Sequence, residues 1–224
     1  MTLPSLLSAA LPLEPSAALS AGLVAAIPSP SEHTWYLGIF PVRAYALAIL
    51  AGIAPEPITA QLQQRLVTAG NGLVETTLSQ ALYKFEALLA RKDQFGPWVF
   101  DKIARDWGYM LFNGATSFWE TRQGGWDFDN AGSLCHGWSA TPVYFYGAYL
   151  LGIKPLSPGF RTFSVDPLME IVPAAAGTVP TPAGPIHVRW EKAAGKPICR
   201  LVHPPGTTPR VPDPGLECQI ENTC

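Results

Sequence analysis

The chain has 224 residues, of which 48% are hydrophobic and 14% are charged, so it carries enough apolar side chains for a buried core. Its formal net charge is −2 and its 15 Lys and Arg residues are scattered along the sequence rather than clustered. This pattern excludes the basic surface of a nucleic-acid or anionic-membrane binding protein. The longest apolar stretches, such as residues 44–53, are well short of the roughly 20 residues that a membrane-spanning helix requires. We therefore expect neither a nucleic-acid nor a membrane partner.

The sequence leaves the cellular compartment open, with the cytoplasm slightly favoured over secretion. The first 30 residues are apolar and alanine-rich, but they lack a basic n-region and are interrupted by prolines. In an oxidising compartment a Cys199–Cys218 or a Cys218–Cys224 disulfide could form, whereas a reducing cytosol would keep all four cysteines as thiols. The cysteines form no CxxC pair and the four histidines are far apart in the sequence. We therefore expect no metal site and no cofactor.

Residues 1–36 show no sustained periodicity, and we predict a poorly ordered lead-in there. Pro41 and Gly52 bracket a first helix at residues 42–51, and Pro57 and Gly70 bracket a second at 58–67. Together these two segments predict a helical hairpin.

Three further helices are predicted downstream. Thr77 and Gln80 match a capping box for a helix over 77–90, and Pro97 opens one with an apolar stripe over 97–111. Residues 138–151 contain few polar side chains, which is typical of a buried helix.

The composition changes after Pro155, where frequent prolines punctuate short runs of alternating polarity. Such runs predict a small β module at about 160–202, followed by an irregular proline-rich tail. We thus divide the chain into a lead-in (1–36), a domain of helical hairpins (37–157) and a C-terminal β module with its tail (158–224).

The residues best suited to chemistry lie between the helices at 97–111 and 138–151. Glu120 follows an aromatic residue in a loop at a helix end and is the candidate catalytic carboxylate, although a solvated loop glutamate is the simpler alternative. His136 could bond a sugar hydroxyl or serve only as a hydrogen-bonded structural residue. Asp127 and Asp129 could bond hydroxyls or orient Glu120, or simply form turns beside glycines.

Tryptophan is abundant in the same region, and its ring stacks well on the apolar faces of sugars. Those on helical stripes belong to the predicted core, which leaves Trp119 and Trp126 as the stacking surfaces. Aromatic, imidazole and carboxylate groups at this spacing predict a carbohydrate site.

Several runs resemble the C-terminal part of the α-L-rhamnosidases of glycoside hydrolase family 78, and the resemblance covers roughly residues 40–192 in order. The runs are WGYML at 107–111, GATSFWE at 114–120, AGSLCHGWSA at 131–140, YLLGIKP at 149–155 and GTVPTPAGPI at 177–186.

This resemblance implies a mainly α chain, built as a partial (α/α)6 six-hairpin barrel of antiparallel helical hairpins and followed by a small C-terminal β-sandwich. It also implies inverting hydrolysis of terminal α-L-rhamnosyl residues, with a rhamnosylated glycoside or oligosaccharide as substrate. Glu120 matches the general base, His136 matches a histidine at the rhamnose subsite, and Trp119 and Trp138 match aromatic residues in or just behind it.

The family's general acid belongs to an earlier part of its catalytic domain and has no counterpart in residues 1–40. We therefore interpret the chain as a fragment with the base but without the acid. The alternatives are a non-catalytic carbohydrate-binding or interaction module, and an enzyme completed by a separate chain. A partial barrel would expose apolar helix faces, which predicts self-association unless the missing N-terminal hairpins cover them.

Overall fold

The computed structural model describes residues 40–68, 73, 75–192 and 196–223, and it divides into two compact units, residues 1–75 and 76–224. The predicted lead-in therefore lies outside the described residues. The predicted domain boundaries at 37 and 157 stay a prediction. Among the described residues, no helix is both long and apolar enough to cross a membrane.

The described part of the first unit contains helices α2 (Phe40–Leu50) and α3 (Glu56–Val67), which contact each other. Apolar side chains of both helices are buried, and the Arg65 guanidinium donates a hydrogen bond to the Tyr45 hydroxyl over 3.2 Å. The two helices of the predicted hairpin are confirmed to within two residues at each end.

The second unit begins with α4 (Ala81–Leu89) and α5 (Lys92–Phe112), which also pack together. The prediction of a capping box was wrong: Thr77 lies in a turn before α4, and no side chain caps that helix. The predicted start of the next helix at Pro97 was also wrong, because α5 begins five residues earlier. Pro97 is the sixth residue of α5, beyond the first four residues whose N–H groups lack helical partners, so it removes one helical hydrogen bond near the start of the helix.

The predicted helix over 138–151 is present but does not keep α-helical geometry along its length. A 3₁₀ turn (Gly137–Ser139) precedes α6 (Thr141–Phe145), and a π-helical turn (Tyr146–Leu150) follows it. Gly152 ends the run with a φ of 77°, a conformation that glycine adopts without strain. The segment is not wholly buried as predicted, because Val143 and Tyr146 face solvent.

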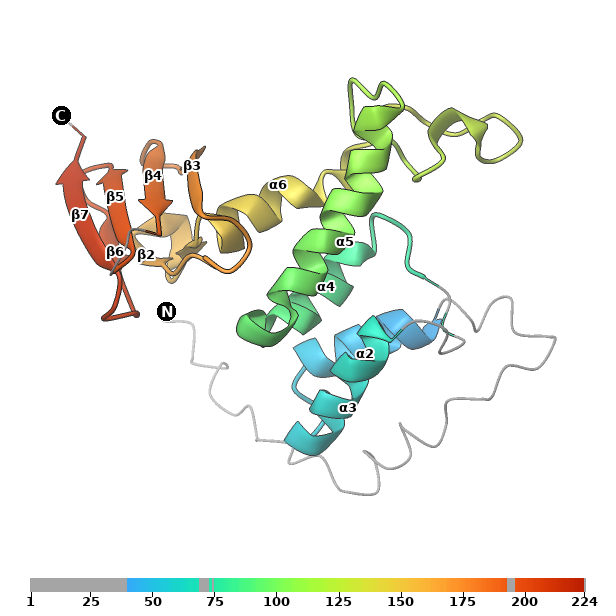
Figure 1. Ribbon diagram of the computed structural model, residues 1–224, viewed down its shortest axis with the longest axis horizontal. Coiled ribbons are helices and arrows are strands. Elements are labelled where there is room, and N and C mark those ends of the chain that lie inside the picture. The colour runs from blue at the N-terminus through green and yellow to red at the C-terminus, as the bar shows by residue number, and fades with distance from the viewer. Residues whose placement is uncertain (1–39, 69–72, 74, 193–195, 224) are drawn as a thin grey trace, which may run out of the picture. The chain divides into compact units, whose positions relative to one another are not determined.

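The rest of the chain forms two β-sheets with the strand orders β1-β2-β6 and β3-β4-β5-β7 (Figure 1). Two neighbouring pairs, β2 with β6 and β5 with β7, are parallel, and the others are antiparallel. The strands are β1 (Ile153–Pro155), β2 (Thr162–Val165), β3 (Ala174–Val179), β4 (Ile186–Glu191), β5 (Ile198–His203), β6 (Thr208–Arg210) and β7 (Glu217–Asn222). The predicted tail is therefore not irregular, since β6 and β7 lie within it.

The prediction of a mainly α chain built as a partial barrel was wrong. The chain is mixed, because its helices are followed by seven strands in two sheets within the described residues. The strand contribution is larger than predicted, because β6 and β7 lie in the segment that was expected to be irregular. The C-terminal β part of the prediction does agree with the structure.

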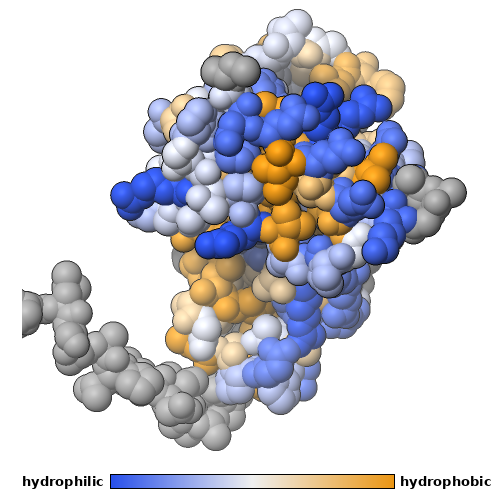
Figure 2. Space-filling view, turned by 90° about the vertical axis from the view of Figure 1, so that its left-hand side faces the viewer, coloured by the Kyte–Doolittle hydropathy of each residue, from blue (hydrophilic) through white to orange (hydrophobic). Residues whose placement is uncertain are grey.

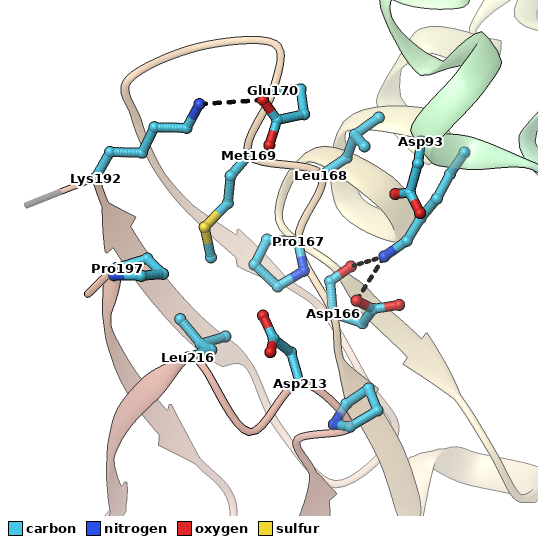
Figure 3. Close-up of a pocket in the computed structure, with 12 residues that line it drawn as sticks. Asp93, Asp166, Pro167, Leu168, Met169, Glu170, Lys192, Pro197, Asp213 and Leu216 are labelled. Atoms are coloured by element: carbon cyan, nitrogen blue, oxygen red, sulfur yellow. Dashed lines mark hydrogen bonds and ion pairs between the residues drawn. The ribbon is translucent and has the colours of Figure 1, made fainter. Parts of the chain in front are cut away.

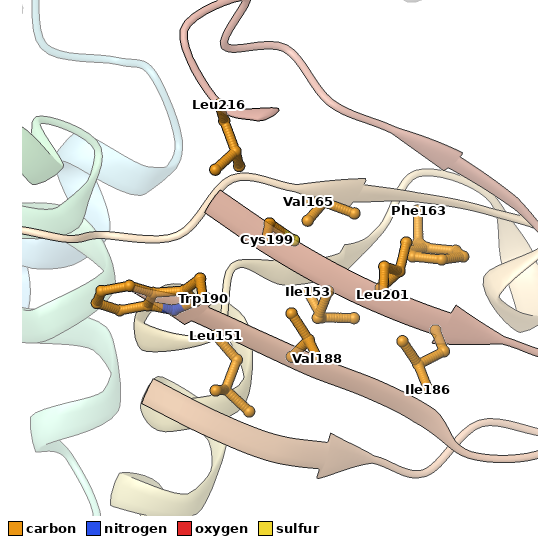
Figure 4. Packing of buried hydrophobic residues seen from close by; sticks show 10 residues of the cluster. All are labelled: Leu151, Ile153, Phe163, Val165, Ile186, Val188, Trp190, Cys199, Leu201 and Leu216. Carbon is orange, nitrogen blue, oxygen red and sulfur yellow. The ribbon is translucent and has the colours of Figure 1, made fainter. Parts of the chain in front are cut away.

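The core of the β part lies between the two sheets, as a sandwich requires (Figure 4). Strand β4 alternates buried and exposed side chains, so Ile186, Val188 and Trp190 point into it. Phe163 and Val165 of β2 approach from the other sheet. Figure 2 views the end of the molecule that carries the sheets, where a narrow strip of hydrophobic side chains runs between hydrophilic ones.

Trp190 also connects the sandwich to the helical segment before it. Its ring is fully buried, and its indole N–H donates to the Leu150 carbonyl over 2.8 Å. Replacing this residue should therefore remove both core packing and the hydrogen bond between the sandwich and the helical segment.

We predict that Trp190→Ala lowers the free energy of unfolding by about 3–5 kcal/mol, since the substitution leaves a large cavity in the core. Trp126→Ala is the matched control, because this ring is exposed and its loss should change stability by only about 0.5 kcal/mol. Urea denaturation of both variants checks the prediction. Equal losses in the two variants would contradict it.

Candidate functional site

The loop between α5 and α6 brings Glu120 and His136 side by side. The Glu120 N–H donates to the Ser133 carbonyl over 2.9 Å, and the His136 N–H donates to the Phe118 carbonyl over 2.7 Å. These two bonds pair residues 118–120 with residues 133–136. The carboxylate and the imidazole therefore come from segments that the backbone itself aligns.

The Glu120 carboxylate is held at one oxygen and open at the other. Its Oε2 accepts a hydrogen bond from the Ser133 N–H over 3.3 Å and lies 3.7 Å from the Nδ1 of His136. Its Oε1 has no hydrogen-bond partner among the described residues. The side chains of Glu120 and His136 are 35% and 23% exposed, so both are accessible to a ligand.

The buried hydroxyl of Ser139 holds the segments of Glu120 and His136 together. The Oγ of Ser139 lies 2.5 Å from the Trp119 carbonyl oxygen and 2.9 Å from the His136 carbonyl oxygen, and its proton can bond either one. The Ser139 carbonyl in turn accepts a bond of 2.7 Å from the Trp107 indole on α5. Ser139 thus ties both segments of the site to the helix.

The sequence patterns assign no role to Ser139 and place Trp107 only in the core. A signal was available, because a small hydroxyl residue just before a helix start often bonds nearby backbone groups. The sequence does not predict which carbonyl groups the Ser139 hydroxyl contacts, since Trp119 lies 20 residues away.

The candidate tryptophans differ in how accessible they are. Trp138 and Trp126 are 71% and 83% exposed, and the ring of Trp138 packs edge-on against His136 with 4.8 Å between centroids. Trp119 is only 9% exposed, and Gly124 lies against its ring so closely that a Cβ there would clash with it. The exposed rings of Trp126 and Trp138 are therefore available for stacking, while Trp119 supports the loop from within.

Asp127 and Asp129 lie in a tight turn at the tip of the same loop. The Asp127 Oδ1 accepts a bond of 3.1 Å from the Phe128 N–H, which is turn geometry. Asp129 is exposed and lies between two other residues of positive φ. Neither carboxylate forms a hydrogen bond or an ion pair with Glu120 in the described structure, so their proposed roles stay predictions.

A separate cavity of about 670 Å³ lies where the start of α5 meets the sheets (Figure 3). Its two lysines are paired with carboxylates: Lys92 lies 2.5 Å from Asp166, and Lys192 lies 3.5 Å from Glu170. Because α5 has 21 residues, and is thus about 30 Å long, this cavity and Glu120 lie near opposite ends of the helix. The cavity is not part of the candidate site.

Among the described residues, no group of three or more His, Cys, Asp or Glu side chains is placed to hold a metal ion. The candidate site itself offers a carboxylate beside an imidazole, with the exposed Trp138 ring against the imidazole.

Comparison with known proteins finds similarity to α-L-rhamnosidases. Residues 152–222 match the family described as the bacterial α-L-rhamnosidase C-terminal domain. The chain is related to the C-terminal part of family 78 α-L-rhamnosidases. An α-L-rhamnosidase of Alteromonas sp. (strain LOR) is 27% identical over 166 residues, which cover 66% of this chain and 17% of that protein. The solved family 78 rhamnosidase of Bacillus sp. GL1 is 30% identical, with a TM-score of 0.70, over 81% of this chain and 20% of that one.

A second kind of relative matches a shorter stretch. The phosphatidylglycerol–prolipoprotein diacylglyceryl transferase of Corynebacterium efficiens is 42% identical over 59 residues, which cover 26% of this chain and 17% of that protein. The chain thus spans less than a fifth of the length of either curated relative.

The hydroxyl of Ser139 yields a direct test of how the site is held together. We predict that Ser139→Ala lowers the free energy of unfolding by about 1–3 kcal/mol, because it removes a buried donor shared by two carbonyl groups. Ser133→Ala is the matched control, since its hydroxyl bonds only the nearby Cys135 backbone at the surface and its loss should cost about 0.5 kcal/mol or less. Thermal unfolding of both variants measures the difference. Indistinguishable midpoints would contradict the role assigned to Ser139.

Proposed function

We propose that this chain carries the general-base half of an α-L-rhamnosidase site, with Glu120 as the base. The observation that carries the proposal is the pairing of Glu120 with His136 in a loop that also carries two exposed tryptophans. It is supported by relatives that are α-L-rhamnosidases. The substrate class is accordingly a rhamnosylated glycoside.

In the proposed reaction the substrate's terminal sugar lies over the loop. The open Oε1 of Glu120 takes a proton from a water molecule as that water attacks the anomeric carbon, on the face opposite the departing group. The bond from the Ser133 N–H holds Oε2 and so fixes the direction of Oε1. Inversion at the anomeric carbon follows from this single displacement.

The neighbouring side chains have binding roles in this proposal. The imidazole of His136 bonds a sugar hydroxyl, and its edge-on contact with Trp138 limits how the ring can turn. The exposed faces of Trp138 and Trp126 stack on the apolar side of the sugar. Trp119 supports the loop from behind, while Asp127 and Asp129 line its outer rim.

Inverting hydrolysis needs a second carboxyl group, which protonates the departing oxygen. We propose that this general acid comes from another part of a rhamnosidase, since the family resemblance maps only the base onto this chain. The chain spans 17% of the Alteromonas relative, which leaves ample room for the acid elsewhere in such an enzyme. The exposed apolar residues near the end of α5, Leu111 and Phe112, are suited to contact that other part or a second copy of the chain.

A substrate whose leaving group departs without protonation tests the general base, Glu120, independently of the general acid. We predict that the full chain hydrolyses 2,4-dinitrophenyl α-L-rhamnoside, whose leaving group departs without being protonated. Glu120→Gln should lower that rate by about 10²–10⁴-fold, because the water then lacks a proton acceptor. The matched control is Asp101→Asn, which removes one surface charge on α5 and should leave the rate unchanged.

Calorimetric binding of L-rhamnose to the same proteins completes the test. Rhamnose binding that survives Glu120→Gln, together with the loss of turnover, agrees with the proposed base. Equal turnover in the wild type and Glu120→Gln would contradict it. Rhamnose binding without turnover in either protein would favour a non-catalytic carbohydrate-binding module.

A further inference from the structure

Two cysteines lie directly opposite each other on neighbouring strands at the C-terminus. Strands β5 and β7 are parallel, and their register pairs Cys199 with Cys218. The two sulfur atoms are 2.6 Å apart, although the residues are 19 positions apart in the sequence. This juxtaposition is created by the fold and is independent of the candidate rhamnose site.

The surroundings of the pair favour a structural rather than a catalytic role. Cys199 is buried in the core of the sandwich, on the strand that also carries Leu201 (Figure 4). Cys218 is partly buried and packs against the same core. A substrate could not reach the Cys199 sulfur without opening the sandwich.

The backbone geometry suits a covalent bond between the strands. Adjacent strands lie about 4.7–4.9 Å apart, whereas disulfides join Cα atoms separated by about 4.4–6.8 Å. Side chains in register on neighbouring strands also point to the same side of a sheet. No movement of either strand is required for the two sulfur atoms to be joined.

We propose that Cys199 and Cys218 form a disulfide that fastens the last strand, β7, to β5. A small disulfide oxidant such as oxidised glutathione supplies the chemistry: the Cys218 thiolate attacks it, releasing one reduced thiolate and leaving a mixed disulfide on Cys218. The Cys199 thiolate then displaces the second thiolate. The protein loses two electrons and two protons, and the oxidant becomes two thiols.

The two cysteines differ in a way that suits this order of events. Hydrogen bonding with Cys199 lowers the pKa of the Cys218 thiol. The same hydrogen bond, together with burial, raises the pKa of Cys199. The more exposed sulfur is thus also the one that ionises more readily, which is what the first attack requires.

The bond would matter because β7 has few other attachments. Among the described strands it pairs with β5 alone and forms the edge of its sheet. The segment between the two cysteines includes β6, which belongs to the other sheet. A bond between Cys199 and Cys218 closes this segment into a loop and restricts the unfolded chain.

Thiol counting on the full chain tests the proposal. After incubation with oxidised glutathione, alkylation under denaturing conditions should label two of the four cysteines, Cys135 and Cys224. Peptide mapping should show Cys199 joined to Cys218. Trypsin alone cannot separate Cys218 from Cys224, because no Lys or Arg lies between them. Digestion therefore also needs a protease that cleaves after glutamate, at Glu221. Labelling of all four cysteines, or a bond from Cys218 to Cys224, would overturn the proposal.

Stability provides a second readout that needs no disruptive substitution. Reduction of the oxidised chain should lower its melting temperature by about 6–12 °C. The Cys135→Ala/Cys224→Ala double variant should show the same drop, and the Cys199→Ala/Cys218→Ala double variant should show none. A melting temperature that reduction leaves unchanged in the wild type would overturn the proposal.

Discussion

The candidate site depends on one buried hydroxyl. The Ser139 hydroxyl contacts the carbonyl group of Trp119, the residue before Glu120, and the carbonyl group of His136 itself. Through its own carbonyl Ser139 is bonded to Trp107, a core residue of α5. The loop from the end of α5 to the start of α6 has more than 25 residues, and Ser139 adds an attachment to α5 to the backbone bonds that pair its two segments. The positions of the carboxylate and imidazole therefore follow from a polar contact rather than from helix packing.

Single hydrogen bonds of this kind also join the π-helical turn of the second unit to a helix and to a sheet. The Tyr149 hydroxyl donates to the Glu86 carboxylate over 2.9 Å, which links the π-helical turn to α4. Trp190 bonds the carbonyl of Leu150 from the sandwich side. The C-terminal end of the segment from α6 to Gly152 is thus attached both to α4 and to the sandwich.

The sequence predicted those features that depend on local patterns. Alternating runs located the strands around Trp190, and Gly152 marked the end of the helical region correctly. The scarcity of polar residues at 138–151 predicted a buried helix, and the segment is helical, but the sequence did not predict its change from α to π geometry at Tyr146 or its exposed side chains. Strands β6 and β7 were missed because parallel pairing with distant strands leaves no local signature. Of the candidate site residues, Glu120 and His136 were expected to be near each other, but the exchange of backbone bonds that aligns them is a property of the folded loop.

The central proposal is that Glu120, His136 and the two exposed tryptophans of the same loop, Trp126 and Trp138, form one rhamnose site. The most direct measurement is a titration with L-rhamnose followed through the indole N–H signals of the seven tryptophans by NMR. The account predicts that the signals of Trp126 and Trp138 shift together with a single dissociation constant, while that of Trp190 in the sandwich core does not. Rhamnose binding that leaves Trp126 and Trp138 unchanged would contradict it.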